Sequence, residues 1–337
     1  MTSKVKIAVI GTGRMGSVHA RNLARLIPEA HLTALCDIRL EVAQAVASEL
    51  GIQRVVKDYH ELLADKEIEA VLIASSTNTH DFIMRDAAEA GKHIFCEKPL
   101  ALELEKVDPA LEAVAKAGVK LQVGFNRRFD KSFKRVHEIV ASGEIGRPCI
   151  LRITNRDPDF PSMEFLRVSG GIFLDLSIHD FDMVLFQLGE VEEVYAIGGV
   201  LVNQELKEFG DLDTSIVTLK FKNGAIGAID NSRKAVYGYD QRLEVFCSNG
   251  TAMANNESED VTVRGNSDGF LSAKPPYFFM QRYAPCYVEE VRQFIECVRD
   301  DKAIPNSGKD GRAALVLGYA AWKSLRENRP VRISEIG

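Results

Sequence analysis

Short, mainly apolar runs alternate with amphipathic stretches over the first 123 residues of the chain. Runs that are apolar on both sides of the backbone are typical of parallel strands covered on both faces. Five such runs predict strands, at Val5–Ile10, Leu32–Cys36, Ala70–Ala74, His93–Cys96 and Lys120–Val123.

The stretches between these runs place apolar residues at helical spacing. They predict five helices, at Met15–Leu26, Leu40–Leu50, Asp58–Leu63, Thr79–Ala90 and Glu103–Ala117. Three of them are followed directly by a glycine, a residue that commonly ends helices. Alternating strands and helices indicate an α/β domain, a Rossmann-type doubly wound parallel sheet over residues 1–123.

Residues 124–337 have a different pattern, which predicts a second domain of the α+β type. Longer strands are expected at Ile150–Asn155, Val191–Val202, Thr214–Phe221, Ala225–Asn231, Arg242–Cys247 and Asp260–Arg264. Helices are expected at Lys131–Ser142, Ile172–Leu188, Val288–Arg299 and Arg312–Glu327. Asn223-Gly224 is a strong hairpin signal. We therefore expect a large, mostly antiparallel open sheet, with closing helices that can return to the first domain.

Composition and charge exclude several classes of protein. A chain of 337 residues suits two domains, and its formal net charge of −6 disfavours nucleic-acid binding. No apolar run approaches the roughly 20 residues that span a bilayer, and no signal peptide is predicted. The six cysteines are scattered, without the spacing of a metal site. Free thiols are typical of a reducing compartment, so we expect a cytoplasmic protein without a metal.

The strongest motif is Gly11-Thr12-Gly13-Arg14-Met15-Gly16, which follows the first predicted strand and opens the first predicted helix. A GxGxxG alone is a weak signal, but this context is the one that a dinucleotide-binding turn requires. The glycines permit a tight turn, close approach of the pyrophosphate and close packing of helix on strand. The N-terminus of the helix then offers free N–H groups to the phosphates.

Asp37 ends the second predicted strand, about 20 residues after Gly16, where a carboxylate can hold the adenosine ribose. Because it would repel a 2′-phosphate, NAD is favoured over NADP. Arg39 complicates this choice, since an arginine nearby could receive a phosphate. The alternative interpretation is that Asp37 only caps the next helix.

Two polar segments follow later strands of the same domain, at the strand ends where ligands of this architecture collect. The loop from Ser75 to His80 contains three cofactor candidates, Ser75, Thr77 and Asn78. His80 could contact the cofactor, although a helix-capping role is favoured. Cys96-Glu97-Lys98-Pro99 follows the fifth strand, and Pro99 should hold Lys98 extended. Glu97 could lie near the cofactor and Lys98 near the reacting oxygen, or the two could form a surface ion pair.

A further segment runs from Gly170-Gly171 to Asp182. If it is one helix, Asp175, His179 and Asp182 share a face and Asp180 points elsewhere. A histidine beside a carboxylate suits abstraction of a proton from an alcohol. Taken alone, this pattern more often indicates a structural, half-buried histidine with the two aspartates on a solvent-exposed edge.

Together these motifs resemble the glucose-fructose oxidoreductase/inositol dehydrogenase family, also called Gfo/Idh/MocA, nearly from end to end. The resemblance rests on Gly11–Gly16, Glu97-Lys98-Pro99, the segment 124–129 (GFNRRF), and the Gly-Gly…Asp175…His179…Asp182 series in that order. It implies a Rossmann domain, bound NAD, and a second domain whose open sheet mediates assembly into a dimer or tetramer. The region around Gly238–Arg242 is most similar to the inositol-oxidising members.

The resemblance also implies roles for individual residues. Lys98, Asp175 and His179 form the implied catalytic set. His179 would take the alcohol proton with help from Asp175, and Lys98 would stabilise charge on the oxygen. The implied substrate contacts are Lys98, Arg127, Asp157, Asp175, His179, Asp182, Tyr237 and Tyr283.

The expected reaction is the NAD-dependent oxidation of a ring secondary alcohol, first of all myo-inositol to its 2-keto form, scyllo-inosose. Asn126 and Arg156-Asp157-Pro158 depart from the expected pattern near the pocket, which leaves the polyol open. One alternative is a dehydrogenase of glucose, another aldose or scyllo-inositol. Another is a non-catalytic sugar or dinucleotide sensor, against which the retention of all three catalytic candidates counts.

Overall fold

Six parallel strands form the centre of a first unit, which consists of the chain up to Asn126 together with Pro285–Ala313. A computed structural model describes residues 4–336. The strands lie in the order β3-β2-β1-β4-β5-β6, the order typical of a dinucleotide-binding fold. They are β1 (Val5–Ile10), β2 (Ala30–Cys36), β3 (Arg54–Val56), β4 (Ala70–Ile73), β5 (His93–Cys96) and β6 (Leu121–Val123). The predicted parallel sheet is confirmed, and only the three-residue β3 was missed.

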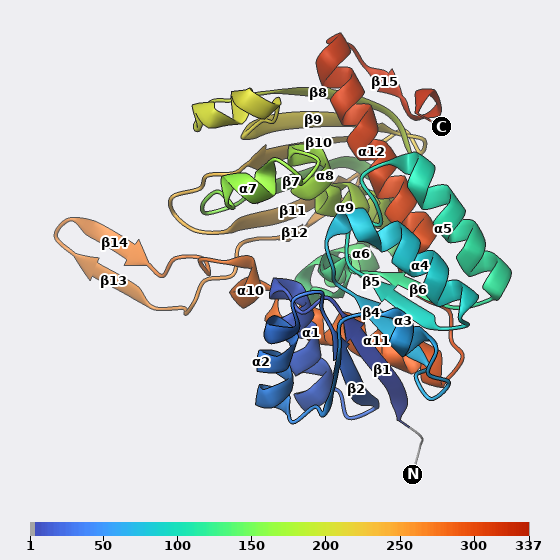
Figure 1. Cartoon of the computed structure of the whole chain (residues 1–337). Helices are drawn as coiled ribbons and strands as arrows, with labels where there is room; N and C mark the ends of the chain where they lie inside the picture. Colours follow the sequence, from blue (N-terminus) through green and yellow to red (C-terminus); the bar gives the residue numbers. More distant parts are fainter. Residues whose placement is uncertain (1–3, 337) are drawn as a thin grey trace. The chain divides into compact units, whose positions relative to one another are not determined.

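Helices flank this sheet close to their predicted positions (Figure 1). They are α1 (Arg14–Arg25), α2 (Leu40–Leu50), α3 (His60–Leu63), α4 (His80–Glu89) and α5 (Leu104–Ala117). A later helix, α11 (Ala284–Arg299), joins the same core, where Val291 and Phe294 pack with Ile7 and Val9 of β1 and Leu23 of α1. The first unit is therefore completed by chain from near the C-terminus.

The second unit contains Arg127–Ala284 and the chain from Ala314 onward, built on a seven-stranded sheet. The sheet order is β12-β11-β7-β10-β9-β8-β15. Its strands are β7 (Pro148–Arg156), β8 (Val191–Gly199), β9 (Thr214–Phe221), β10 (Ile226–Ser232), β11 (Asp240–Cys247), β12 (Gly250–Ala254) and β15 (Val331–Arg332). Only β7 and β10 pair in parallel, so the predicted, mostly antiparallel sheet is confirmed. Asn223-Gly224 forms the predicted β9–β10 turn, with Gly224 at φ 87°.

One face of this second sheet is covered and the other is open. In β9 the side chains of Ser215, Val217 and Leu219 are buried, whereas the alternating Ile216 and Thr218 are exposed. The helices of this unit are α6 (Lys131–Ala141), α7 (Met163–Leu166), α8 (Ile172–Asp175), α9 (Ile178–Leu188), α10 (Phe279–Arg282) and most of α12 (Gly308–Glu327). The buried face is thus the one that can hold the functional side chains of α9 in place.

A two-stranded hairpin, β13 (Val263–Asn266) and β14 (Gly269–Ser272), projects from the second unit (Figure 1). All eight of its strand residues are exposed. It overlaps only in part with the strand predicted at Asp260–Arg264. Among residues 4–336, no helix is long and apolar enough to cross a membrane.

Candidate functional site

The glycine loop of the first unit has the geometry of a phosphate-binding turn. Gly11 has φ +89°, and a Cβ there would lie 2.5 Å from the backbone nitrogen of Ser75. A Cβ on Gly16 would lie 1.8 Å from the carbonyl oxygen of Gly11, so helix α1 can approach β1 only without a side chain. A Cβ on Gly13 would meet nothing within 4 Å. The loop is therefore closed on the protein side and open at Gly13, where a pyrophosphate can approach the N-terminus of α1.

Asp37 links the end of β2 to this loop. Its Oδ2 accepts hydrogen bonds from the N–H of Thr12 at 2.8 Å and the hydroxyl of Thr12 at 3.0 Å. Its Oδ1 accepts from the N–H of Arg39 at 2.9 Å, and no side chain caps α2. Asp37 thus joins the glycine loop to the start of α2, and its contact with a ribose stays a prediction. Arg39 and Arg14 are exposed, and Met15 is half-buried.

The loop after β4 is held together by its own hydroxyls, and the hydroxyls of Ser75 and Thr79 lie 2.7 Å apart. Thr77 is half-buried and Asn78 is exposed in the short 3₁₀ turn that follows. The favoured capping role of His80 is wrong, because α4 has no side-chain cap. The buried His80 ring instead lies 2.9 Å from the carbonyl oxygen of Pro99 and 3.1 Å from that of Ser75. It ties the β4 and β5 loops together, and burial lowers its pKa although both carbonyls oppose that shift.

Glu97 and Lys98 follow β5 at the same edge of the sheet. The peptide bond between Lys98 and Pro99 is cis, Glu97 is buried, and Lys98 is partly exposed. The Glu97 carboxylate accepts from the N–H of Lys98 at 3.3 Å and lies 2.6 Å from Nε2 of His19. A surface ion pair, the alternative reading of this motif, is contradicted by the burial of Glu97. Because the buried Glu97 is fixed by these contacts, the backbone from which the Lys98 side chain extends is fixed as well.

The segment that carries Asp175 and His179 is not the single helix that was predicted. Helix α8 ends at Asp175 and α9 begins at Ile178. At the break the N–H of Ser177 donates to the carbonyl of Ile172 at 2.9 Å, a wide turn that adds one residue. The Ser177 hydroxyl donates to Oδ1 of Asn231 at 2.6 Å, which anchors the break to the sheet. The half-buried His179 and the buried Asp182 keep their i, i+3 spacing within α9, whereas Asp175 lies in α8, before the break.

Asp180, which the sequence pattern placed elsewhere, is the centre of a buried polar network. Its Oδ1 accepts from Nη1 of Arg127 at 2.6 Å. Its Oδ2 accepts from the side-chain amides of Asn155 at 2.7 Å and Asn231 at 2.8 Å. The two asparagines are register partners on β7 and β10. Burial raises the pKa of the Asp180 carboxyl, and Arg127 and the two amides oppose that shift.

The network extends to Tyr283, a predicted substrate contact. Asn155 Oδ1 accepts from the amide of Gln241 at 2.5 Å, and the Tyr283 hydroxyl donates to Gln241 Oε1 at 3.3 Å. The guanidinium of Arg127 lies 5.7 Å from the centre of the Tyr283 ring. Arg127 and Tyr283 are therefore brought together around Asp180. The sequence signal that could have located this network is the pair Asn155 and Asn231, two polar residues that face inward from β7 and β10.

Asp175 is paired with an arginine that the sequence did not single out. Nη1 of Arg233 donates to Asp175 Oδ2 at 3.0 Å, and Nη2 lies 3.5 Å from Oδ2 of Asp211. The Arg233 side chain is fully buried, whereas that of Asp175 is 16% exposed. The guanidinium thus holds the Asp175 carboxylate from inside and leaves part of it accessible.

The remaining predicted substrate residues have partners within the second unit. Asp182 is buried and forms a bidentate ion pair with Arg128, with contacts of 2.6 to 3.0 Å. The Tyr237 hydroxyl donates to Asp240 at 2.6 Å and accepts from Arg156 at 3.2 Å. Asp157 directly follows β7, and its backbone bonds to Ser232 and Ala235. Direct contact of these residues with a substrate stays a prediction.

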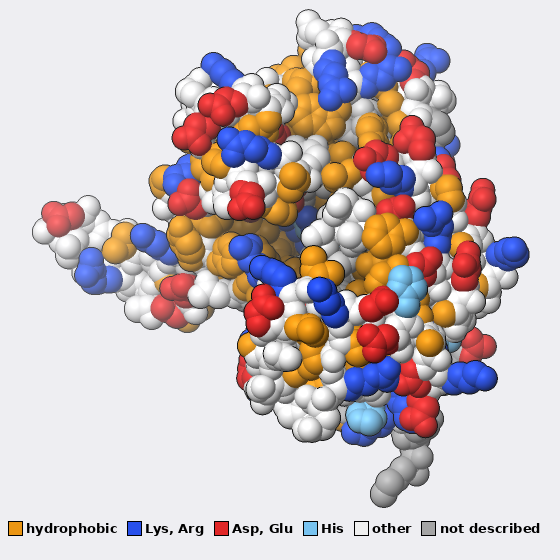
Figure 2. Space-filling view, viewed as in Figure 1, with side chains coloured by type: hydrophobic (Ala, Val, Ile, Leu, Met, Phe, Trp, Pro, Cys, Tyr) orange, Lys and Arg blue, Asp and Glu red, His pale blue; other side chains and the backbone are white. Residues whose placement is uncertain are grey.

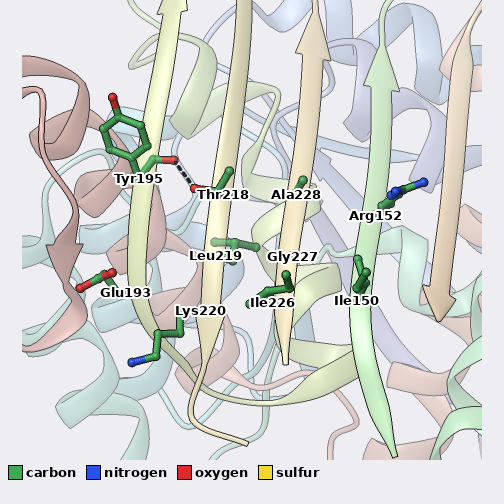
Figure 3. A pocket seen from close by; sticks show the side chains of 10 residues that line it. All are labelled: Ile150, Arg152, Glu193, Tyr195, Thr218, Leu219, Lys220, Ile226, Gly227 and Ala228. Carbon is green, nitrogen blue, oxygen red and sulfur yellow. Dashed lines mark hydrogen bonds between the residues drawn. The ribbon is translucent and has the colours of Figure 1, made fainter. Parts of the chain in front are cut away.

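The open face of the second sheet has a separate hollow, which Figure 3 shows. Its lining comes from the four neighbouring strands β7, β10, β9 and β8: Ile150, Arg152, Glu193, Tyr195, Thr218, Leu219, Lys220, Ile226, Gly227 and Ala228. Asn155 and Asn231 point to the other face of these strands, toward Asp180. The hollow therefore lies on the opposite face of the sheet from the Asp180 network. On the face seen in Figure 2, acidic and basic side chains are interspersed over the first unit.

Two family models match the chain. Residues 5–125 match the oxidoreductase family with an NAD-binding Rossmann fold, and residues 133–253 match the GFO/IDH/MocA C-terminal domain. The first match covers the glycine loop, Asp37 and Lys98, and the second covers Asp175 and His179. These matches agree with the sequence resemblance and with NAD as the cofactor.

Known proteins are similar over nearly the whole length. The chain is 50% identical to the myo-inositol 2-dehydrogenase of Thermotoga maritima, over 98% of this chain and 99% of that protein. It is 39% identical to the scyllo-inositol 2-dehydrogenase (NAD(+)) of Bacillus subtilis, over 99% and 97%. A crystal structure of a myo-inositol dehydrogenase from Lactobacillus casei with NAD(H) and myo-inositol superimposes with a TM-score of 0.89, at 28% identity and covering 98% of this chain and 96% of that one.

Proposed function

The chain belongs to the GFO/IDH/MocA family of NAD-binding oxidoreductases, and we propose that it oxidises myo-inositol to scyllo-inosose with NAD. The observation that carries this proposal is the 50% identity to a myo-inositol 2-dehydrogenase across 98% of the chain. Lys98, Asp175 and His179 are all present in the sequence. A sensor without catalysis has no need of this set.

The proposed chemistry assigns one task to each catalytic side chain. Bound NAD supplies the nicotinamide ring that accepts the hydride of the reacting carbinol. His179 accepts the proton of that alcohol, and Asp175, held by Arg233, stabilises the resulting imidazolium. Lys98 places its ammonium at the same oxygen and stabilises the negative charge that develops there.

The proposed nucleotide contacts are those at the loop edge of the first sheet. The turn from Gly11 to Gly16, including Thr12, Arg14 and Met15, holds the pyrophosphate, and Asp37 with Arg39 holds the adenosine ribose. The loop residues Ser75, Thr77, Asn78 and His80, with Glu97 and Lys98, border the rest of the dinucleotide. The open position at Gly13 supports this assignment.

For the hydroxyls next to the reacting carbinol we propose Arg127, Asp157 and Tyr283. Arg127 and Tyr283 belong to the Asp180 network. Burial raises the pKa of the Tyr239 hydroxyl, and the negative charge of Asp157 helps to raise it. Asp182 and Tyr237 are already bound by Arg128 and Asp240. We propose these two residues as further substrate contacts, because Arg127 and Tyr283 are held by partners in the same way.

A second candidate substrate is scyllo-inositol, which the 39% identity to a scyllo-inositol 2-dehydrogenase favours. The two substrates differ in the orientation of one hydroxyl. Steady-state NADH formation with myo-inositol, scyllo-inositol, glucose and other aldoses, each with NAD and NADP, tests both candidates. We expect the highest kcat/KM with myo-inositol and NAD. A much higher value with another polyol would replace the substrate, and no NADH with any polyol despite NAD binding would indicate a sensor.

We also propose that the chain self-associates, as a dimer or tetramer, through the open sheet face. Apolar side chains exposed there include Ile216, Ile226, Phe246 and Met253, and several exposed apolar side chains on one sheet face favour a protein partner. Ile226→Glu is expected to reduce the mass in light scattering. The six cysteines are free thiols, which supports a cytoplasmic location.

A further inference from the structure

Two carboxyl groups and an imidazole meet inside the first unit, next to the strand end that carries Lys98. They belong to His19 on α1, Glu97 after β5 and Glu290 on α11. One ligand atom from each lies within 4.8 Å of the others. His19 and Glu290 are fully buried, and Glu97 is 8% exposed. Three ionisable groups are therefore held at close range and largely shielded from bulk water.

Glu290 is the unusual member of this cluster. Neither oxygen of its carboxyl group has a hydrogen-bond partner among the described residues, 4–336. Its backbone carbonyl, by contrast, accepts from the amide of Gln122 at 2.7 Å. A buried ionised carboxylate without partners is strongly unfavourable. Two carboxylates at this separation also repel each other.

Among residues 4–336, none of the charged or titratable groups around Glu290 forms a hydrogen bond with its carboxyl group. His19 lies against Glu97, with Nε2 2.6 Å from Oε1, and its ring packs edge-on against Tyr287. Cys96 ends β5, and burial raises the pKa of its thiol. Lys98 contributes its backbone N–H to Glu97. Burial also raises the pKa of the Glu290 carboxyl well above its ordinary 4.5, and the charge of Glu97 adds to that shift.

A metal ion could in principle bind such a set, but the geometry favours protons. The contact of 2.6 Å between His19 and Glu97 is the length of a charge-assisted hydrogen bond. Two ligand atoms of a divalent ion normally lie farther apart, because each sits about 2.0–2.2 Å from the metal. The imidazole and the Glu97 carboxylate are thus bound to each other.

We propose that Glu290 is a neutral acid in the folded protein, and that its carboxyl group, within 4.8 Å of that of Glu97, helps to keep Glu97 in place. Glu290 is a positioning residue. It acts through Glu97, whose carboxylate packs tightly against Gly124. A Cβ on Gly124 would lie only 2.9 Å from Oε2 of Glu97. This packed carboxylate in turn holds the backbone of Lys98. The consequence for catalysis rests on the proposed function, whereas the protonation state does not.

The pH dependence of stability tests the protonation state. In the unfolded wild-type chain Glu290 ionises above its ordinary pKa of 4.5, but in the folded chain it stays protonated. Wild type therefore loses stability, relative to a variant that cannot ionise, as pH rises through 4.5. The full chain with Glu290→Gln, and separately with Glu290→Met, is compared with wild type by thermal unfolding between pH 4.5 and 8.

We expect the Tm of each variant minus that of wild type to rise with pH, by roughly 2–4 °C for each 1 kcal/mol of linkage. The change of this Tm difference with pH is the quantity to be compared. A loss of stability from imperfect packing of the substituted side chain is the same at every pH and does not affect it. Glu289→Gln, at a half-exposed position of the same helix, is the matched control and should give no such rise. A difference that falls with pH means that Glu290 is ionised in the fold and overturns the proposal. A flat difference, equal to the control, does the same.

Two further measurements separate the alternatives. Infrared spectra of wild type should contain the C=O band of a buried protonated carboxyl group, and Glu290→Gln should remove it. Elemental analysis should find no stoichiometric divalent metal. A metal that is present in wild type and lost in Glu290→Gln would overturn the proposal in favour of a cation site.

Turnover tests the positioning role. Glu290→Gln, the neutral isostere, should keep most of the kcat for the polyol. Glu290→Met, which places an apolar side chain against the Glu97 carboxylate, should lower kcat about tenfold, the equivalent of about 1.4 kcal/mol. Equal losses in the two variants would overturn the positioning role. If wild type itself oxidises no polyol, the proposed function fails, while the stability and infrared results still decide the protonation state.

Discussion

The two units build their candidate sites in opposite ways. In the first unit the nucleotide loop depends mainly on backbone, with Gly11 and Gly16 placed where a Cβ would overlap neighbouring backbone atoms. In the second unit the site depends on buried charged side chains, such as Asp180 with Arg127 and Asp175 with Arg233. Backbone sites recognise the phosphates that all dinucleotides share, whereas side-chain networks can be varied to select one polyol.

The difference also separates what each site tolerates. A backbone loop fails through steric overlap when a side chain is added. A buried ion pair fails through desolvation when one partner is removed, because the other charge is left uncompensated. Substitutions in the two units should therefore affect binding, turnover and stability in different proportions.

Lys98→Ala would give the largest effect and would test whether the first unit contributes a catalytic side chain as well as backbone. Loss of charge stabilisation at the reacting oxygen should lower kcat by about 10²–10⁴-fold. The dissociation constant of NAD should change little. Steady-state kinetics and NAD titration are the measurements, with Lys106→Ala as the surface control. Near-normal turnover would exclude Lys98 from the chemistry.

Asp180→Ala should cause the largest loss of stability, about 3–5 kcal/mol, because Arg127 would stay buried without its carboxylate. Asp159, which pairs with Lys234 at 2.6 Å and is 52% exposed, is the matched control. Asp159→Ala should lose at most about 1 kcal/mol. Urea unfolding measures both. Similar losses at the two positions would mean that the buried network has no special structural role.

Gly16→Ala and Gly13→Ala separate steric closure from ligand access within one loop. The Cβ on Gly16 meets the Gly11 carbonyl at 1.8 Å, so this variant should lose about 1–3 kcal/mol of stability or more. Gly13→Ala has free space and an extended backbone, φ −63° and ψ −159°, so its stability should change little. Its affinity for NAD should fall roughly 5- to 100-fold. Normal NAD affinity in Gly13→Ala would move the pyrophosphate away from this loop.

Asp37→Ser should have the smallest effect, confined to the choice of cofactor. Removal of the carboxylate abolishes repulsion of a 2′-phosphate, while Arg39 remains exposed nearby. The ratio of kcat/KM for NADP to that for NAD should rise roughly tenfold, about 1.4 kcal/mol. An unchanged ratio would mean that the ribose is held elsewhere.

Local patterns predicted most of the first unit. The helix predicted at Leu40–Leu50 has those bounds in the structure, and Asp37 follows β2 as expected. Both are determined by neighbours in the sequence, since apolar spacing and the αL glycine at Gly51 define the helix. The role of His80 was missed, because its partner Pro99 lies on a different loop.

The amino-acid sequence by itself determined the alternation of strands and helices, the glycine turn, the NAD-type carboxylate and the family, because these depend on residues close in the chain. Only the tertiary structure decided the break between α8 and α9 and the place of Asp180. That break depends on Ser177 bonding to Asn231, 54 residues away. A register shift of one residue rotates every later side chain of a helix, and no local pattern can contain the distant partner that causes it.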